Sequence, residues 1–164
     1  NIGAATINGL ELELMASPGN GWFFEASLAL LDAGYDDIDT SITLIGKNFD
    51  FERVPETTVS LGVSKEISLS DLGILTFRAD WSYRSETFND AYNTTLLETD
   101  SYDLFDASVR WSNRQEDWTV VLSGRNLTNE EFLVTGVYGT AFQSYEGTYN
   151  RGRQWQLEVR KHFN

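Results

Sequence analysis

Hydrophobic and polar residues alternate one by one along several stretches of this 164-residue chain. The pattern is clearest between Gln154 and Phe163, where every second residue is apolar until Lys161. A period of two indicates β-strands that have one apolar and one polar face. We therefore predict an all-β protein of about seven strands, in the ranges 8–15, 22–34, 57–65, 75–84, 101–112, 118–125 and 154–163.

The connections between the predicted strands alternate in length. The turns at 17–21, 68–73 and 113–117 are short, whereas three loops are long: Tyr35 to Glu56, Phe88 to Asp100 and Asn126 to Asn150. Barrels of the bacterial outer membrane show this asymmetry, with short periplasmic turns and long extracellular loops. If Phe163 ends on the periplasmic side, the three loops are extracellular and Asn1 also lies on the outer side.

The period alone does not decide whether the apolar face points into a barrel or out of it. A soluble barrel places that face around a cavity, whereas a membrane barrel turns it to lipid. Aromatic residues gather near the strand ends, as in the girdles of membrane barrels: Trp22, Trp81, Tyr83, Trp111, Trp118 and Trp155. The opposite face carries charges of both signs, which can pair across strands in the water-filled lumen of a membrane barrel. We therefore predict a segment of an antiparallel transmembrane β-barrel.

Composition narrows the possible functions. The net charge of −13 argues against nucleic acid as a partner, because a protein that neutralises phosphates carries excess lysine and arginine. The absence of cysteine excludes disulfides and thiolate metal sites. His162 is the only histidine and lies near the end of the chain. We therefore predict no catalytic residue, no bound metal and no cofactor.

The most distinctive sequence motif lies near the end of the chain. After the predicted strand 118–125, the sequence reads Gly-Arg-Asn-Leu-Thr-Asn-Glu-Glu-Phe over residues 124–132, and Arg-Gly-Arg at 151–153 precedes the last alternating strand. This order resembles the C-terminal end of TonB-dependent outer-membrane receptors. The segments 7–13 and 79–84 extend the resemblance upstream, although the specific part is the tail. Arg125 to Asn129 is expected to shape the loop at the outer end of the penultimate strand.

The resemblance implies import of a scarce ligand, such as a ferric siderophore, cobalamin or a carbohydrate, across the bacterial outer membrane. Import of this kind makes and breaks no covalent bond, so the resemblance also implies no enzyme activity. The implied partners are outer-membrane lipid, a small-molecule ligand and the energy-transducing inner-membrane complex, which acts through an N-terminal region missing here. Receptors of this kind have about 22 strands around a plugged lumen. We therefore expect residues 1–164 to be the C-terminal part of the barrel domain, without the plug domain.

Residues that contact the ligand are expected in the long loops, because binding residues concentrate on loops held by a rigid scaffold. The candidates are aromatic and acidic: Tyr35, Asp36, Asp37, Phe88, Tyr92, Tyr138, Phe142 and Tyr145. Asp36, Asp37 and Asp39 offer oxygen ligands to calcium, but they lack the full pattern of a calcium loop. A solvated acidic loop is therefore the preferred interpretation.

Two other classes of function stay open at this point. The first is a small soluble or membrane β-barrel that binds a hydrophobic ligand or a partner. The second is an outer-membrane hydrolase, which the single histidine disfavours. A requirement for detergent would separate the membrane barrel from the soluble one.

Overall fold

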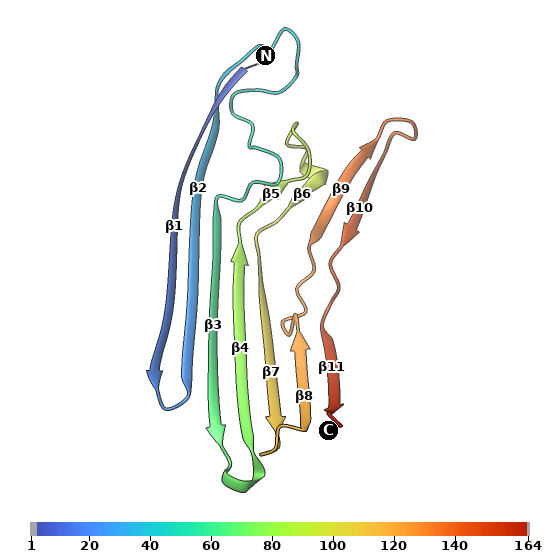
Figure 1. Ribbon diagram of the computed structural model, residues 1–164. Helices are drawn as coiled ribbons and strands as arrows, with labels where there is room; N and C mark the ends of the chain where they lie inside the picture. The colour runs from blue at the N-terminus through green and yellow to red at the C-terminus, as the bar shows by residue number, and fades with distance from the viewer. Residues whose placement is uncertain (1–2, 164) are drawn as a thin grey trace.

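The computed structural model describes residues 3–163, whose main element is an antiparallel sheet of seven strands (Figure 1). The order of strands in the sheet follows the order in the chain, so each main strand pairs with the next one. The strands are β1 (Gly3–Gly19), β2 (Trp22–Ile38), β3 (Thr57–Ser68), β4 (Ile74–Arg84), β7 (Tyr102–Ser112), β8 (Trp118–Arg125) and β11 (Gln154–Lys161). The predicted seven-stranded antiparallel fold is confirmed.

The short and long connections lie at opposite ends of the sheet, as predicted (Figure 1). The first short turn is Asn20–Gly21, and both residues have positive φ angles, of 51° and 73°. A 3₁₀ helix, η1 (Ser70–Leu72), forms part of the second. Gly3 lies at the long-loop end, which agrees with the expected outer position of the N-terminus; Asn1 itself lies outside the described residues.

The long loops contain regular structure that the sequence pattern did not predict. The loop after β4 holds a short ladder between β5 (Thr87–Phe88) and β6 (Glu98–Thr99), with the 3₁₀ helix η2 (Thr95–Leu97) before β6. The loop after β8 holds a hairpin of β9 (Leu133–Gly139) and β10 (Ser144–Tyr149). Within residues 3–163, no helix is long and apolar enough to cross a membrane.

The first two strands are longer than predicted. Tyr35, Asp36 and Asp37 were expected in a loop, but they belong to β2, where Tyr35 pairs with Ala5 and Asp37 with Ala4. The prediction was wrong because the ladder of backbone hydrogen bonds continues after the alternation of apolar side chains has ended. A β-bulge between Ala4 and Ala5 accompanies this extension.

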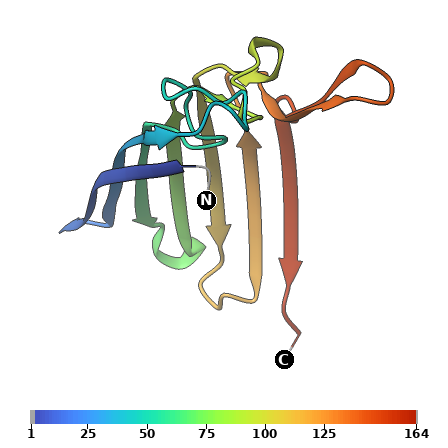
Figure 2. The ribbon, with the colours of Figure 1, turned by 90° about the horizontal axis from the view of Figure 1, so that it is seen from above.

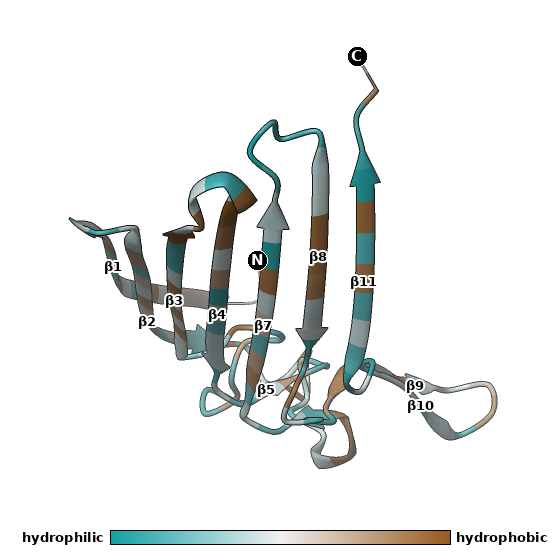
Figure 3. Cartoon of the chain, turned by 90° about the horizontal axis from the view of Figure 1, so that it is seen from below, coloured by the Kyte–Doolittle hydropathy of each residue, from teal (hydrophilic) through white to brown (hydrophobic). Residues whose placement is uncertain are grey.

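Cross-strand register sorts the side chains onto two faces. In one row, Phe77, Val109, Leu122 and Leu157 lie opposite one another on β4, β7, β8 and β11. The row one residue further on contains Arg78, Ser108, Ser123 and Gln156. Figure 3 shows the resulting alternation of hydrophobic and hydrophilic bands along these strands. We call the side of Phe77 the apolar face and the side of Arg78 the polar face.

The apolar face is not gathered into a sealed core. Leu12, Phe77 and Leu157 are 55%, 42% and 68% exposed. Among the described residues, the buried hydrophobic side chains are Ile38, Leu97 and Leu133, all at the long-loop end. The sheet is curved and stays open between β1 and β11 (Figure 2). A closed soluble barrel with an apolar interior therefore does not describe this fold.

Candidate functional site

The long loops pack on one another around a small core of their own. Leu97 from η2 is 1% exposed, and Leu133 at the start of β9 is also buried. Two glycines of the hairpin make room for them: a Cβ atom on Gly136 would lie 2.8 Å from Leu97 Cδ2, and one on Gly147 would lie 2.6 Å from Leu133 Cδ1. The β9–β10 hairpin is thereby fixed against the loop that carries β5 and β6.

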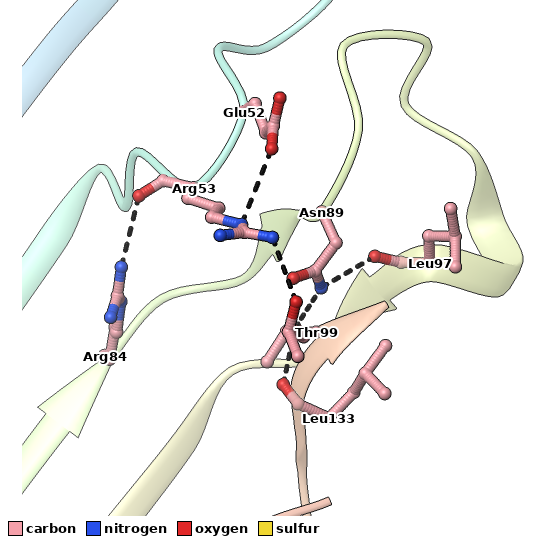
Figure 4. Close-up of polar contacts among 8 residues, drawn as sticks. Glu52, Arg53, Arg84, Asn89, Leu97, Thr99 and Leu133 are labelled. Carbon is pink, nitrogen blue, oxygen red and sulfur yellow. Dashed lines mark hydrogen bonds and ion pairs between the residues drawn. The ribbon is translucent and has the colours of Figure 1, made fainter. Parts of the chain in front are cut away.

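A buried polar network surrounds this core (Figure 4). The side-chain amide of Asn89 donates hydrogen bonds to the carbonyl of Leu97 at 3.0 Å and to Thr99 Oγ1 at 2.9 Å. The hydroxyl of Thr99 then donates to the carbonyl of Leu133 at 2.8 Å. Asn89 and Thr99 are both buried, so these bonds satisfy groups that water does not reach.

Arg53 connects the first long loop to the other two. Its backbone N–H donates to the carbonyl of Phe88 at 2.9 Å, and its Nη2 donates to Thr135 Oγ1 on β9 at 2.9 Å. Its carbonyl accepts a hydrogen bond of 3.2 Å from Nη2 of Arg84, the last residue of β4 (Figure 4). Residues from four separate segments therefore meet at one point above the end of the sheet.

A cavity of about 120 Å³ lies between these elements. Arg53 and Arg84 line it together with Tyr102 and Phe132, whose rings stack with their centroids 3.6 Å apart. The Nε atom of Arg84 is buried and has no hydrogen-bond partner. Arg84 pairs with Thr58 and Tyr102 in the ladder, which places it on the polar face. The cavity is therefore an aqueous-side feature of the loop layer.

Asn126 fixes the loop that follows β8. It has a positive φ of 50°, a conformation that asparagine adopts more readily than most residues. Its side chain accepts a hydrogen bond from the Glu130 N–H at 2.7 Å and donates to the carbonyls of Glu130 and Arg151 at 2.8 and 3.1 Å. Asn129 accepts a bond from the N–H of Arg153 at 2.9 Å. These bonds confirm that Arg125 to Asn129 shapes the loop.

Ion pairs span the middle of the polar face. Arg78 on β4 pairs with Glu25 on β2 and with Asp80, at 2.6 Å for the latter. Gly62 lies between them on β3, and a Cβ atom there would stand 2.7 Å from Glu25 Cγ. This glycine lets the side chains of β2 and β4 meet across the intervening strand. The polar face thus carries paired charges of both signs, as the sequence predicted.

Aromatic residues lie at both ends of the apolar face. At the short-turn end, Lys65 Nζ lies 4.9 Å from the ring centroid of Trp22, and Lys161 Nζ lies 5.0 Å from that of Trp118. At the long-loop end, Trp81 stacks with Tyr83 and donates from Nε1 to Asp103 at 3.2 Å. Two aromatic levels with a band of aliphatic residues between them match the girdles of a membrane barrel.

The predicted ligand residues fall into separate groups rather than one site. Tyr138 and Tyr145 face each other on the hairpin with ring centroids 5.0 Å apart, and Phe142 at its tip is 81% exposed. Tyr92 is exposed on the loop between β5 and η2. Phe88 belongs to β5, and its carbonyl binds the N–H of Arg53.

The three acidic residues near the end of β2 each have a different partner. Asp36 accepts a hydrogen bond from Thr6 at 2.7 Å, and Asp37 pairs with Lys47 at 3.3 Å. Asp39 accepts bonds from the hydroxyl and N–H of Ser41, which lower the pKa of its carboxyl. Tyr35 contacts Phe51 edge-on at 4.5 Å. Within residues 3–163, no group of three metal-binding side chains forms, so this geometry does not favour the calcium alternative.

Sequence reasoning missed the residues that hold the loops together, namely Arg53, Arg84, Asn89 and Thr99. The one available signal was Arg84, which ends the charged side of an alternating strand directly before a long loop. The only histidine, His162, lies at the other end of the sheet, where its N–H binds the carbonyl of Asp117 at 2.8 Å.

Antiparallel strands with aromatic levels at both ends, an aliphatic band between them and short turns opposite long loops define a segment of an outer-membrane-type β-barrel. The family model described as TonB dependent receptor-like, beta-barrel, matches residues 1–127. The chain belongs to this family, and it is part of an outer-membrane protein. The expectation drawn from the sequence resemblance is confirmed.

Solved structures show the same fold. The ferric yersiniabactin uptake receptor FyuA from Yersinia pestis aligns with the whole chain at 21% identity and a TM-score of 0.84. The siderophore receptor PiuA and the ferric preacinetobactin receptor BauA, both from Acinetobacter baumannii, align with 98% and 96% of it. Their identities are 23% and 20%, and their TM-scores are 0.77 and 0.72. A comparison with curated proteins found no match.

The chain spans about a quarter of the length of these receptors, covering 24%, 22% and 22% of the three structures. The family and these structures are transport receptors rather than enzymes. In the described sheet, β1 and β11 each have one unpaired edge, as strands at the two ends of a segment of a larger barrel would.

Proposed function

We propose that residues 1–164 form the C-terminal wall of a TonB-dependent receptor barrel and supply part of the extracellular binding surface for a ferric siderophore. The observation that carries this proposal is the convergence of three long loops on Arg53, because it creates one ordered surface from segments far apart in the sequence. The names of the similar structures, which are receptors for siderophores, support the ligand class.

The chain would act by binding and guiding a solute rather than by changing covalent bonds. The hairpin presents Tyr138, Tyr145 and Phe142 to the outside, and these aromatic rings offer contact area at little cost in conformational entropy. Below the loops, the polar face with Arg78, Glu25 and Asp80 would line the aqueous path through the barrel. A plug domain and the energy-transducing inner-membrane complex would act through the N-terminal region of the receptor.

Uptake by the full-length receptor tests this function. In one variant, residues 134–148 are replaced by a short Gly-Ser linker; in a matched variant, only Phe142 at the hairpin tip is changed to Ser. Iron-limited cells are supplied with a ferric hydroxamate, a ferric catecholate, cyanocobalamin or a maltodextrin. We expect saturable uptake of one ferric chelate, its loss in the linker variant and a partial loss in Phe142→Ser.

Heat-dependent gel mobility of the receptor shows whether the barrel has assembled in each variant. Retained assembly with lost uptake supports the proposal. Unchanged uptake by the linker variant would contradict a role of the hairpin in ligand contact, and transport of cyanocobalamin or maltodextrin alone would contradict the siderophore class.

A further inference from the structure

The cavity beside Arg53 and Arg84 differs in charge from the rest of the molecule. The chain contains 25 acidic and 12 basic residues. Nevertheless, two arginines and no acidic residue line this cavity. The larger depression in the middle of the polar face has the opposite character, since its lining includes Glu13, Glu25 and Asp106. The loop layer therefore contains a locally positive site in an acidic protein.

Arg84 has hydrogen-bonding capacity that the protein does not use. A guanidinium group carries five N–H donors, and the protein contact of Arg84 is the bond from Nη2 to the carbonyl of Arg53. Its Nε is buried without a partner, and no carboxylate of residues 3–163 lies within 4.0 Å of its charged group. Arg78, six residues earlier on the same face of β4, is by contrast paired with both Glu25 and Asp80. Arg84 therefore keeps N–H donors that no protein acceptor of residues 3–163 occupies.

From these observations we propose that Arg84, assisted by Arg53, forms a binding site for one small oxyanion group, such as a carboxylate or a phosphate. A buried, unpartnered donor is costly, and a planar guanidinium matches the paired oxygens of such a group. Arg53 is held beside it by the bond to Thr135 and by an ion pair of its Nε with Glu52 at 3.5 Å (Figure 4), so Arg53 adds a second, partly neutralised cation with little reorganisation. Arg53 comes from the first long loop and Arg84 from the end of β4, and the repulsion between two cations decreases when an anion binds between them.

The dimensions of the cavity limit what can enter. The cavity volume of about 120 Å³ gives room for several water molecules. This space fits one oxyanion group but not a complete metal chelate. Asn89 and Thr99 already donate to the carbonyls of Leu97 and Leu133, while the stacked rings of Tyr102 and Phe132 form an apolar wall. Orientation of the anion therefore depends on the arginines.

The position of Arg84 indicates where the anion comes from. Arg84 and Tyr102 are cross-strand partners on the polar face, whereas lipid meets the apolar face. The oxyanion therefore arrives from the aqueous side, either free in solution or as part of the imported molecule. In the second case, which rests on the proposed function, the receptor prefers chelates that carry a free carboxylate over neutral ones.

Phosphate binding tests the site directly. The full-length receptor is purified in detergent, freed of lipopolysaccharide and titrated with inorganic phosphate by isothermal calorimetry at low ionic strength. Arg84→Met removes the charge and keeps the length, Arg84→Lys keeps the charge without the fork, and Arg53→Met tests the second cation. The control is Arg114→Met, which removes an exposed cation from the short-turn end. We expect about tenfold weaker binding or more in Arg84→Met, a smaller loss in Arg84→Lys and Arg53→Met, and no change in the control.

Equal phosphate affinity of the wild type, Arg84→Met and Arg53→Met would overturn the proposal, as would an equal loss in Arg114→Met, which would show a general effect of charge. If Arg84→Met does not assemble, Arg53→Met and Arg84→Lys decide between these outcomes. The failure of the proposed function would look different. A receptor that imports neither ferric citrate nor a neutral ferric trihydroxamate, but binds phosphate through Arg84, retains the anion site and loses the siderophore assignment.

Discussion

The backbone N–H of Asn126 donates a hydrogen bond of 2.8 Å to the carboxylate of Asp106, a residue of β7. The next N–H, that of Leu127, donates to the carbonyl of Phe105 at 2.8 Å. The chain leaving β8 is therefore held against the polar side of its neighbour strand before it turns into the loop. These two bonds tie the start of the loop to β7.

Asn126→Ala should destabilise the receptor by about 2–4 kcal/mol. The substitution removes three side-chain hydrogen bonds of a residue that is 6% exposed and places alanine at a positive φ. Asn126→Asp, which keeps the acceptor for the N–H of Glu130, should lose less. Urea unfolding of the full-length receptor in lipid measures both. Equal stability of wild type and Asn126→Ala would show that the bonds to Glu130 and Arg151 contribute nothing.

Neighbouring residues of β8 test which face contacts lipid. Leu122→Arg places a charge on the apolar face between Val109 and Leu157, and it should cost about 2–4 kcal/mol near the middle of the bilayer. Ser123→Arg adds the same side chain on the polar face, opposite Ser108 and Gln156, and should cost less than about 1 kcal/mol. Unfolding in lipid vesicles gives the difference. A larger loss for Ser123→Arg would reverse the assignment of the two faces.

The glycines of the hairpin provide a prediction for the loop layer. Gly147→Ala should loosen the contact between β10 and Leu133, because the added Cβ would lie 2.6 Å from Leu133 Cδ1. Gly139→Ala is the control, since its nearest neighbouring atom stands at 3.6 Å. Amide hydrogen exchange in segments 87–99 and 133–149 should rise at least about fivefold in Gly147→Ala alone. Similar exchange in both variants would mean that the core around Leu97 tolerates the extra methyl group.

Asp117 should make the stability of the paired strands β8 and β11 depend on pH. Hydrogen bonds from Lys161 and Asn113, together with the charge of Lys161, hold the pKa of the Asp117 carboxyl below its ordinary value of 3.8. The unfolded chain then takes up this proton at higher pH than the folded one. The stabilisation is therefore fully present above pH 3.8 and is lost as the pH falls through the lower folded value.

Comparison of the wild type with Asp117→Asn measures this contribution. The difference in unfolding temperature between the two receptors should be constant from about pH 5 to 7 and should shrink below about pH 4. Asp71→Asn at the neighbouring short turn serves as the control for loss of a carboxylate paired with an exposed arginine. A difference that stays constant down to pH 3 would exclude the assigned role of Asp117.

The strands were predictable because each one displays its two faces in the sequence. Alternation identified β4, β7 and β8 to within one residue, and β3 except for its last three residues, since one side of each strand meets lipid and the other meets water. The same reasoning placed Tyr35 and Asp37 in a loop, because it follows side chains and not backbone hydrogen bonds. The ladder between β1 and β2 continues to Ile38 through residues without an apolar pattern.

The loop layer was not predictable in the same way. Leu97 and Leu133 are 36 positions apart, and neither lies in a stretch where apolar and polar residues alternate. The contact of Arg84 with Arg53 likewise joins the end of one strand to a distant loop. Such convergence depends on the path of the chain in space. Local sequence identified aromatic candidates such as Tyr138 and Phe142, but it contained no information about which of them meet.

The strands decrease in length across the sheet, from 17 residues in β1 and β2 to 8 in β8 and β11. At about 3.3 Å per residue, the first pair extends roughly 56 Å and the last pair roughly 26 Å, close to the 25 Å apolar band of an outer-membrane barrel. The β9–β10 hairpin, a separate sheet, supplies the missing height beside β8 and β11 (Figure 1). The rim thus has a continuous half and a jointed half, and the height of the jointed half depends on the hydrogen bonds that the loop layer makes to Leu133 and Thr135.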